Sequence, residues 1–177
     1  MAMHLIIDGY NLLAAMAGCG SLMAPQSEMA REALLRDLAA YRRRKGHAVT
    51  VVFDGWQHGQ PIEGREHRAG VQVIYSKRGE RADQVIQRLA REYGADCAIV
   101  SSDHEIVNNA RAHGAFVMGA REFSDKIRLR AKPGAMLVNK ELDTGDDLML
   151  RRTSKKKGNP RKLPKAERQR SKQLKRF

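Results

Sequence analysis

Residues 4–11 read HLIIDGYN, a short run of β-forming residues that ends in an aspartate, a glycine and an asparagine. A similar pattern returns at residues 49–54, VTVVFD, and at residues 97–103, CAIVSSD. Each run has the length of a buried strand and is followed by polar residues typical of turns. We therefore expect three strands of one sheet, each with an acidic residue at or just beyond its carboxyl end.

Helical segments lie between these runs. Apolar residues recur at helical spacing in residues 27–45, which end before Gly46, and in residues 81–93, which end before Gly94. Ser102, followed three residues later by Glu105, predicts a capping box at the start of another helix. The predicted helices cover residues 27–45, 81–93, 102–114 and 121–130, and further strands cover residues 71–75 and 115–118. This alternation predicts βαβ units, and so an α/β fold with a parallel sheet and helices on both faces.

The charge is concentrated at the carboxyl terminus. The chain has 177 residues, with 33 Lys and Arg against 20 Asp and Glu and a formal net charge of +13. Residues 151–177 contain 13 of the basic residues and one acidic residue, which leaves 20 basic and 19 acidic residues in the body. With few large apolar residues, this tail is expected to be disordered on its own.

A polyanion is the natural partner of such a tail, and RNA is the partner that we expect. The tail residues predicted to contact RNA are Lys155, Lys156, Lys157, Arg161 and Lys162. A tail that only keeps the protein in solution, or that binds any anionic surface, is the alternative interpretation.

The organisation is predicted as one domain over residues 1–132, a connecting arm over residues 133–150 and the basic tail. The first apolar run is too short for a signal peptide or a membrane span, which predicts a cytoplasmic protein with no membrane partner. Cys19 and Cys97 lie far apart without a CxxC pair, so neither a disulfide nor a zinc site is expected. The sequence gives no indication of the oligomeric state.

Four carboxylates are expected to meet at one edge of the sheet. In an open parallel sheet the functional crevice lies beyond the carboxyl ends of the strands, where Asp8, Asp54 and Asp103 fall. Asp83 lies in the first turn of the helix that follows the third strand. Clustered carboxylates repel one another unless cations balance them, and Mg²⁺ or Mn²⁺ accepts such oxygen ligands. A metal held there could activate water against a phosphodiester, although each acid taken singly can also be a turn or capping residue.

Several neighbours of these acids have two interpretations. Asn11 can bond Asp8 or a metal-bound water, or it can be a turn residue. Ser101 and Ser102 can hold a metal-bound water or a phosphate, although capping is the simpler role for Ser102. Trp56 can stack on a base or pack as a lid. In the polar loop that follows, Arg65, His67 and Arg68 can bind phosphate or simply be solvated.

Taken in order, the segments IIDGYNLL, VVFDGW, YSKRGERADQVI, IVSSDHEI and GAFVMGAREF resemble the NYN-domain proteins of the PIN-like nuclease superfamily, and most closely its bacterial YacP-like branch. The resemblance covers residues 3–130. It implies a PIN-like sheet and a ribonuclease that depends on Mg²⁺ or Mn²⁺ and leaves a 5′-phosphate. The resemblance assigns to the site Asp8 and Asn11 of the DGYN motif, Asp83 of the ERAD motif and Asp103 of the SSD motif. Asp54 of the FDG motif has a less certain role.

The chain departs from this family at one position. The family commonly has two adjacent acids after the alanine of the third motif, whereas Asp83 is followed here by Gln84. This lowers the carboxylate count and leaves open whether one or two metals bind. YacP-like members are also thought to act on mRNA at the ribosome, which agrees with the basic tail.

The leading hypothesis is a metal-dependent endoribonuclease in which Asp8, Asp83 and Asp103 hold the metal and Asp54 and Asn11 support it. The alternative is an RNA- or ribosome-binding protein with weak or no catalysis. A third hypothesis is metal-independent cleavage by paired histidines such as His58 and His67, because acid–base chemistry needs two proton carriers. The absence of a GxxxxGK[ST] loop argues against an NTPase.

Overall fold

The computed structural model describes residues 3–17, 27–55, 61–128, 165–175 and 177. The chain divides into two compact units, Met1–Ala131 and Lys132–Phe177. The strands are β1 (His4–Asp8), β2 (Ala48–Phe53), β3 (Gly64–Arg68), β4 (Val71–Tyr75), β5 (Cys97–Val100) and β6 (Phe116–Met118). The helices are α1 (Gly9–Ala17), α2 (Glu28–Lys45), α3 (Ala82–Tyr93), α4 (His104–Ala112), α5 (Ala120–Arg128) and α6 (Lys165–Leu174), with a 3₁₀ turn at Gly94–Asp96.

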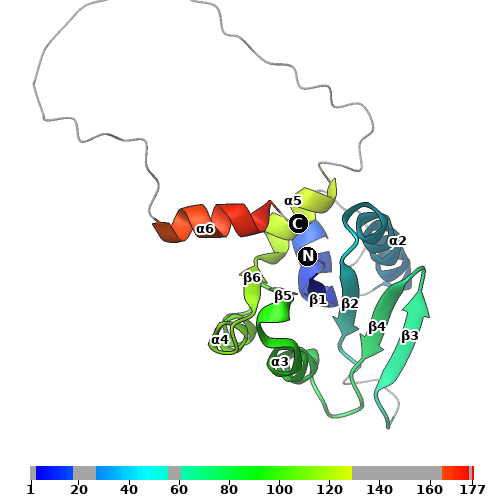
Figure 1. The fold of residues 1–177 in the computed structure, drawn as a ribbon. Helices are drawn as coiled ribbons and strands as arrows, with labels where there is room; N and C mark the ends of the chain where they lie inside the picture. Colours follow the sequence, from blue (N-terminus) through cyan, green and yellow to red (C-terminus); the bar gives the residue numbers. More distant parts are fainter. Residues whose placement is uncertain (1–2, 18–26, 56–60, 129–164, 176) are drawn as a thin grey trace, which may run out of the picture. The chain divides into compact units, whose positions relative to one another are not determined.

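The first unit is built on one six-stranded sheet in the order β3-β4-β2-β1-β5-β6 (Figure 1). The pairs from β4 to β6 are parallel, whereas β3 runs antiparallel to β4. The expected α/β class is therefore confirmed, with one antiparallel edge strand added. Asp8 is aligned with Val52, and Ile7 with both Val51 and Val100, so β1, β2 and β5 end close together.

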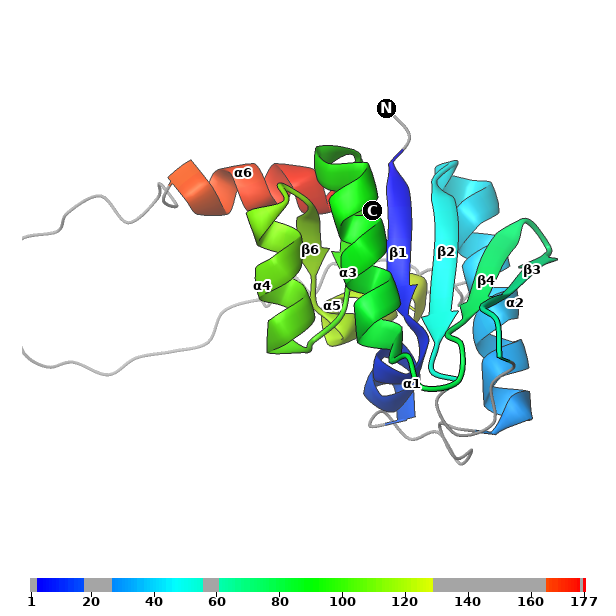
Figure 2. The same cartoon turned by 90° about the horizontal axis from the view of Figure 1, so that it is seen from below.

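Helices cover both faces of this sheet. Figure 2 shows α3 and α4 side by side in front of the strands and α2 behind them. On the α3 face, Val85, Ile86 and Leu89 pack against apolar residues of the central strands. Most apolar side chains that the helical spacing places on one face of α2 are buried, among them Leu34, Leu38 and Tyr41, whereas Met29, at the start of the helix, is exposed. The carboxyl ends of the strands thus remain the exposed edge between two covered faces.

The predicted strands agree closely with the structure, and the one at 71–75 has the predicted bounds. The helix predicted over residues 27–45 begins at Glu28, because Ser27 is its cap: the Ser27 hydroxyl oxygen accepts a hydrogen bond from the Ala30 N–H at 3.2 Å. At its other end Gly46 adopts φ 70°, a left-handed conformation that suits glycine. Local caps therefore set the bounds of this helix.

One helix and one strand of the first unit were not predicted. Helix α1 begins directly after Asp8, within the segment that was treated only as a motif. Residues 64–68 were expected to be a loop, but they form β3, and this prediction was wrong. A two-residue turn at Ala69 and Gly70, with φ of 51° and 83°, joins β3 to β4. Two residues with positive φ are characteristic of tight hairpins whose strands share the sheet's twist.

Gly9 lies where β1 turns into α1. An added Cβ at this position would lie 2.4 Å from Cε1 of the Phe53 ring, too close for any side chain. The ring of Phe53 also packs edge-on against Tyr10, with centroids 5.3 Å apart. The glycine of the DGYN segment therefore lets α1 begin against the end of β2, and this keeps the two strand ends together.

In the second unit, the structure describes α6 and residues 175 and 177, whereas the predicted arm and residues 151–164 lie outside the described residues. Helix α6 departs from the expectation of a tail without secondary structure. Its sequence, KAERQRSKQL, is rich in residues of high helix propensity, so a helix forms although few large apolar residues are present. Arg168, Arg170 and Lys172 are exposed on it. No described helix is long and apolar enough to cross a membrane.

Candidate active site

The predicted acidic residues do gather at the carboxyl edge of the sheet. Asp8 is the last residue of β1, Asp54 follows β2, Asp103 precedes α4, and Asp83 lies in the first turn of α3. Asp8 is almost buried, Asp83 is half-buried, and Asp54 and Asp103 are exposed. The edge therefore presents one carboxylate deep in the protein and three nearer to solvent.

Asp8 is held by hydrogen bonds on both carboxylate oxygens. The Asn11 N–H donates to Oδ1 at 3.1 Å, so Asp8 also caps the first turn of α1. The Ser101 hydroxyl donates to Oδ2 at 3.3 Å. Burial raises the pKa of Asp8 to about 6, and the negative charges of Asp83 and Asp103 add to this rise, while the two hydrogen bonds oppose it. A raised pKa of this kind is typical of carboxylates in functional sites.

Ser101 connects this buried carboxylate to Asp103. The Ser101 hydroxyl oxygen also accepts a hydrogen bond from the Asp103 N–H at 3.1 Å. Asn11 reaches the same loop, because its Oδ1 accepts from the Ser102 N–H at 3.1 Å. The loop after β5 is thus joined to the start of α1, and Asn11 acts as a positioning residue between them.

The capping box expected at Ser102 is wrong. Asp103 is the cap of α4, and its Oδ1 accepts from the N–H groups of Glu105 and Ile106 at 2.7 and 3.3 Å. The Ser102 hydroxyl instead accepts from the Ala120 N–H at 3.2 Å, at the start of α5. One oxygen of Asp103 is therefore used within α4, and the other carries no hydrogen bond within the described residues.

Asp83 is electrostatically coupled to its neighbours. Burial is the largest cause that raises the pKa of Asp83. The negative charges of Asp103, Glu105 and Asp54 raise this pKa further, whereas the positive charge of Arg81 lowers it. Asp83 in turn raises the pKa of Asp8. The charges of Asp83 and Asp103 thus act on Asp8, and those of Asp103 and Asp54 act on Asp83.

Asp54 has a buried partner that the sequence did not single out. The Ser76 hydroxyl, fully buried after β4, donates to Asp54 Oδ1 at 3.4 Å and accepts from the Gly55 N–H at 2.9 Å. Ser76 therefore orients the turn that carries Asp54. The role of Asp54 at the border of the site stays a prediction.

Gln84 occupies the position where a second acid was expected. Its Oε1 accepts a hydrogen bond from the Arg81 N–H at 3.1 Å, so Gln84 caps the first turn of α3. The side chain that replaces the acid thus has a local structural role.

The donor chemistry of this edge fits a divalent cation, because neighbouring carboxylates raise the pKa of Asp8 and of Asp83 and a cation would relieve this repulsion. The distances between these side chains fit a metal less well. Among the described residues, no three His, Cys, Asp or Glu side chains lie close enough together to form a group that could hold a metal. Mg²⁺ usually keeps several waters and binds through one or two carboxylates, so a closed three-ligand set is not required.

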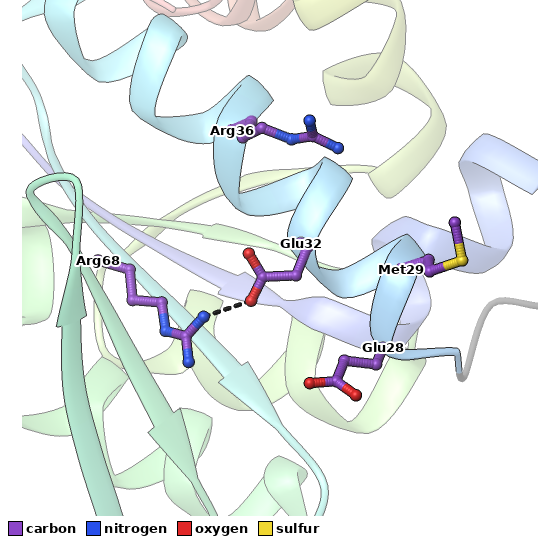
Figure 3. A pocket seen from close by; sticks show the side chains of 5 residues that line it. All are labelled: Glu28, Met29, Glu32, Arg36 and Arg68. Carbon is purple, nitrogen blue, oxygen red and sulfur yellow. Dashed lines mark hydrogen bonds and ion pairs between the residues drawn. The ribbon is translucent and has the colours of Figure 1, made fainter.

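The arginines predicted to bind RNA lie on β3, at the far edge of the sheet. Arg65 pairs with Glu63 at 2.7 Å, and Arg68 pairs with Glu66 at 3.2 Å and with Glu32 of α2. Figure 3 shows Arg68 pointing toward Glu32 beside a cavity of about 530 Å³. Their charges are thus at least partly neutralised by carboxylates. Trp56, His58 and the predicted RNA-binding residues of the tail lie outside the described residues.

Ser76, Glu105 and Arg81 were missed as parts of this edge. Glu105 was considered only as a capping partner, and Ser76 is a single polar residue after an apolar strand. Their positions depend on how α3, α4 and the strand ends approach one another, which local sequence patterns do not give. The signal that could have found Arg81 is its place two residues before Asp83.

Comparisons with known proteins place this fold and edge in a family. The chain is 31% identical over 126 residues to the uncharacterized protein YacP of Bacillus subtilis (strain 168), covering 70% of this chain and 74% of that protein. It is also similar to crystal structures of Rae1 (YacP) from Bacillus subtilis. A mutant form gives a TM-score of 0.58 at 31% identity, covering 71% of this chain and 74% of the other.

A second Rae1 (YacP) structure gives a TM-score of 0.57 at 28% identity, covering 74% of this chain and 78% of the other. Residues 5–176 match the family described as the YacP-like NYN domain, so the match extends past β6 and α5 through α6. NYN domains are part of the PIN-like nuclease superfamily, whose members generally use divalent metal ions. The chain therefore belongs to the YacP-like NYN domain family and has a nuclease-like fold.

Proposed function

We propose that this protein is an endoribonuclease that depends on Mg²⁺ or Mn²⁺ and hydrolyses RNA phosphodiester bonds, with mRNA presented by the ribosome as its substrate. The observation that carries the proposal is the coupled set of carboxylates, in which the buried Asp8 has a pKa near 6 and responds to Asp83 and Asp103. Because carboxylates repel phosphates, RNA binding alone does not account for four of them at one edge, whereas a bound divalent cation does.

Asp8, Asp83 and Asp103 would hold the metal, directly or through its bound waters, and Asp54 would support the site from the end of β2. A bound divalent ion supplies an activated water and neutralises charge on the phosphate under attack. Ser101 and the Asn11 N–H fix the orientation of the Asp8 carboxylate. Asn11 also holds the loop that carries Asp103, so the ligands from β1 and β5 keep their relative positions.

The basic tail would hold RNA or the ribosome, with Lys155, Lys156, Lys157, Arg161 and Lys162 as its proposed contacts. Helix α6 carries further exposed positive charges, on Arg168, Arg170 and Lys172, that could bind the same polyanion. Because the tail adds affinity without sequence recognition, cleavage specificity would come from the acidic edge and from the way the RNA is presented.

A second candidate function is RNA or ribosome binding with weak or no catalysis. Two observations favour it: Gln84 caps α3 in place of a second acid, and the described carboxylates do not form a closed ligand set. Histidine catalysis gains no support from the described residues, since His67 is exposed on β3 and His58 lies outside them.

The test is mapping of RNA 5′ ends in cells that express the wild-type protein or the Asp8→Asn variant. We expect new 5′-monophosphate ends only with the wild type, because the variant lacks the central carboxylate. Cells are preferred to naked RNA, since an enzyme that needs the ribosome would be missed in solution. Identical end maps, with both proteins still sedimenting with ribosomes, would support the binding function and contradict the nuclease.

A further inference from the structure

A cavity of about 370 Å³ opens beside Asp83, between α3 and α4. It is lined by Gly79, Arg81, Asp83, Gln84, Gln87 and Glu105. Its volume lies within the range of small-ligand sites. Because Asp83 forms part of its wall, a group bound in the cavity would lie directly beside the proposed metal site.

The charges of this cavity indicate how RNA could enter it. Asp83 and Glu105 are negative, and Arg81 is the only cation among the lining residues. Arg65, Arg68 and Arg88 all pair with glutamates, but no described carboxylate lies within 4.0 Å of the Arg81 guanidinium. Arg81 nevertheless lies close enough to lower the pKa of Asp83. Its hydrogen-bond donors are therefore available to a phosphate in an otherwise acidic cavity.

The hydrogen-bonding groups of the cavity favour bases that can donate. Gln87 Nε2 donates to Glu105 Oε1 at 3.4 Å, a long bond that a ligand could replace. The Glu105 carboxylate accepts hydrogen bonds, and Gln87, whose Nε2 is bonded to Glu105, offers its Oε1 as a further acceptor. Adenine, cytosine and guanine carry exocyclic amino groups that can donate to such acceptors, whereas uracil has two carbonyl oxygens and one ring N–H.

We propose that this cavity is a nucleotide subsite next to the scissile phosphate, in which Arg81 holds a phosphate and Glu105 with Gln87 selects a base bearing an exocyclic amino group. This inference rests on the proposed function, since it takes RNA as the substrate. It adds a preference: uracil is disfavoured at one position beside the cleaved bond. The subsite draws on α3 and α4 together, because each helix supplies one member of the selecting pair.

The test measures binding, so that it does not depend on cleavage. The full-length Asp8→Asn protein is titrated with a short randomised single-stranded RNA, and the bound fraction is sequenced. Adding Arg81→Gln should weaken binding roughly 10- to 100-fold, the worth of one charge-assisted phosphate contact. Arg81→Lys should retain most of the affinity. Arg91→Gln is the matched control, because Arg91 is exposed on the same helix and does not line the cavity.

We expect uracil to be depleted at one position of the bound RNA and to return when Glu105 is replaced by Gln, whose amide can donate to a carbonyl. The inference is overturned if Arg81→Gln binds RNA like Arg91→Gln, or if uracil is as frequent as the other bases. New 5′ ends in cells would then still support the nuclease. Conversely, selective binding that needs Arg81, in a protein that cleaves nothing, would uphold the subsite and reject the proposed function.

Discussion

Replacing Asp8 by asparagine should stabilise the fold above pH 6 while it abolishes cleavage. Asp8 is 9% exposed, and burial with the charges of Asp83 and Asp103 raises its pKa from 3.8 to about 6. At 1.36 kcal/mol per pKa unit, the ionised carboxylate costs the folded state about 3 kcal/mol. Asparagine has nearly the same shape and removes this charge. The free energy of unfolding should therefore rise by about 2 to 3 kcal/mol, or roughly 3 °C in melting temperature per kcal/mol.

The sign of the pH dependence follows from the raised pKa. The folded protein binds the Asp8 proton more tightly than the unfolded chain, so the wild type loses stability as the pH rises from about 4 through 6. The gain from Asp8→Asn should be absent below pH 4, grow across this interval and stay constant above it.

Urea unfolding from pH 3.5 to 8 without divalent metal measures this gain. Asp125→Asn, at an exposed position of α5, is the control and should stay within about 0.5 kcal/mol. An Asp8→Asn protein no more stable than wild type at pH 8, or a gain independent of pH, would refute the reasoning.

Three further predictions follow from single contacts. Asp103→Ala should lower the free energy of unfolding by about 1 kcal/mol because it removes the cap of α4. Asp103→Ser keeps a capping oxygen and should be more stable. Equal free energies of unfolding in urea for these two variants would contradict the capping role. Arg88→Met should lower the free energy of unfolding by about 1 to 3 kcal/mol, because it leaves the buried Glu80 without its partner at 2.9 Å. Arg91→Met is the control and should be nearly neutral. An equal loss of stability in the two variants would argue against the role of this ion pair. Replacing the five predicted RNA-binding residues of the tail by glutamine should reduce the slope of log affinity against log salt by about 3.5, measured with single-stranded RNA; an unchanged slope would exclude them as phosphate contacts.

The sequence predicted the central strands well because their apolar runs and flanking turn residues are local signals. Gly46 and Ser27 likewise set the ends of α2 through contacts within a few residues. Strand β3 was missed because its sequence, GREHR, has no apolar face, and its pairing with β4 comes from the turn at Ala69 and Gly70. Helix α1 was missed because its first residues look like a turn, and its position depends on the fit of Gly9 against Phe53.

The acidic edge was predictable for a similar reason. The carboxyl ends of parallel strands must meet, so the acids after β1, β2 and β5 could be placed from order alone. The polar groups that position those acids could not be predicted in the same way. Ser101 bonds Asp8 across 93 residues, and Ser76 bonds Asp54 across 22, so both contacts depend on strand order and register. The choice of Asp103 over Ser102 as the cap of α4 depended on the distant Ala120 N–H, which takes the serine hydroxyl.

A metal site at the ends of β1 and β5 can be tested by titration with Mn²⁺, followed by electron paramagnetic resonance, because free and bound Mn²⁺ give distinct signals. We expect the wild-type protein to bind Mn²⁺ and expect Asp8→Asn, Asp83→Asn and Asp103→Asn each to weaken this binding strongly, while Asp125→Asn leaves it unchanged. Mn²⁺ binding that survives all three substitutions, or no binding by the wild type, would contradict a metal site at the ends of β1 and β5.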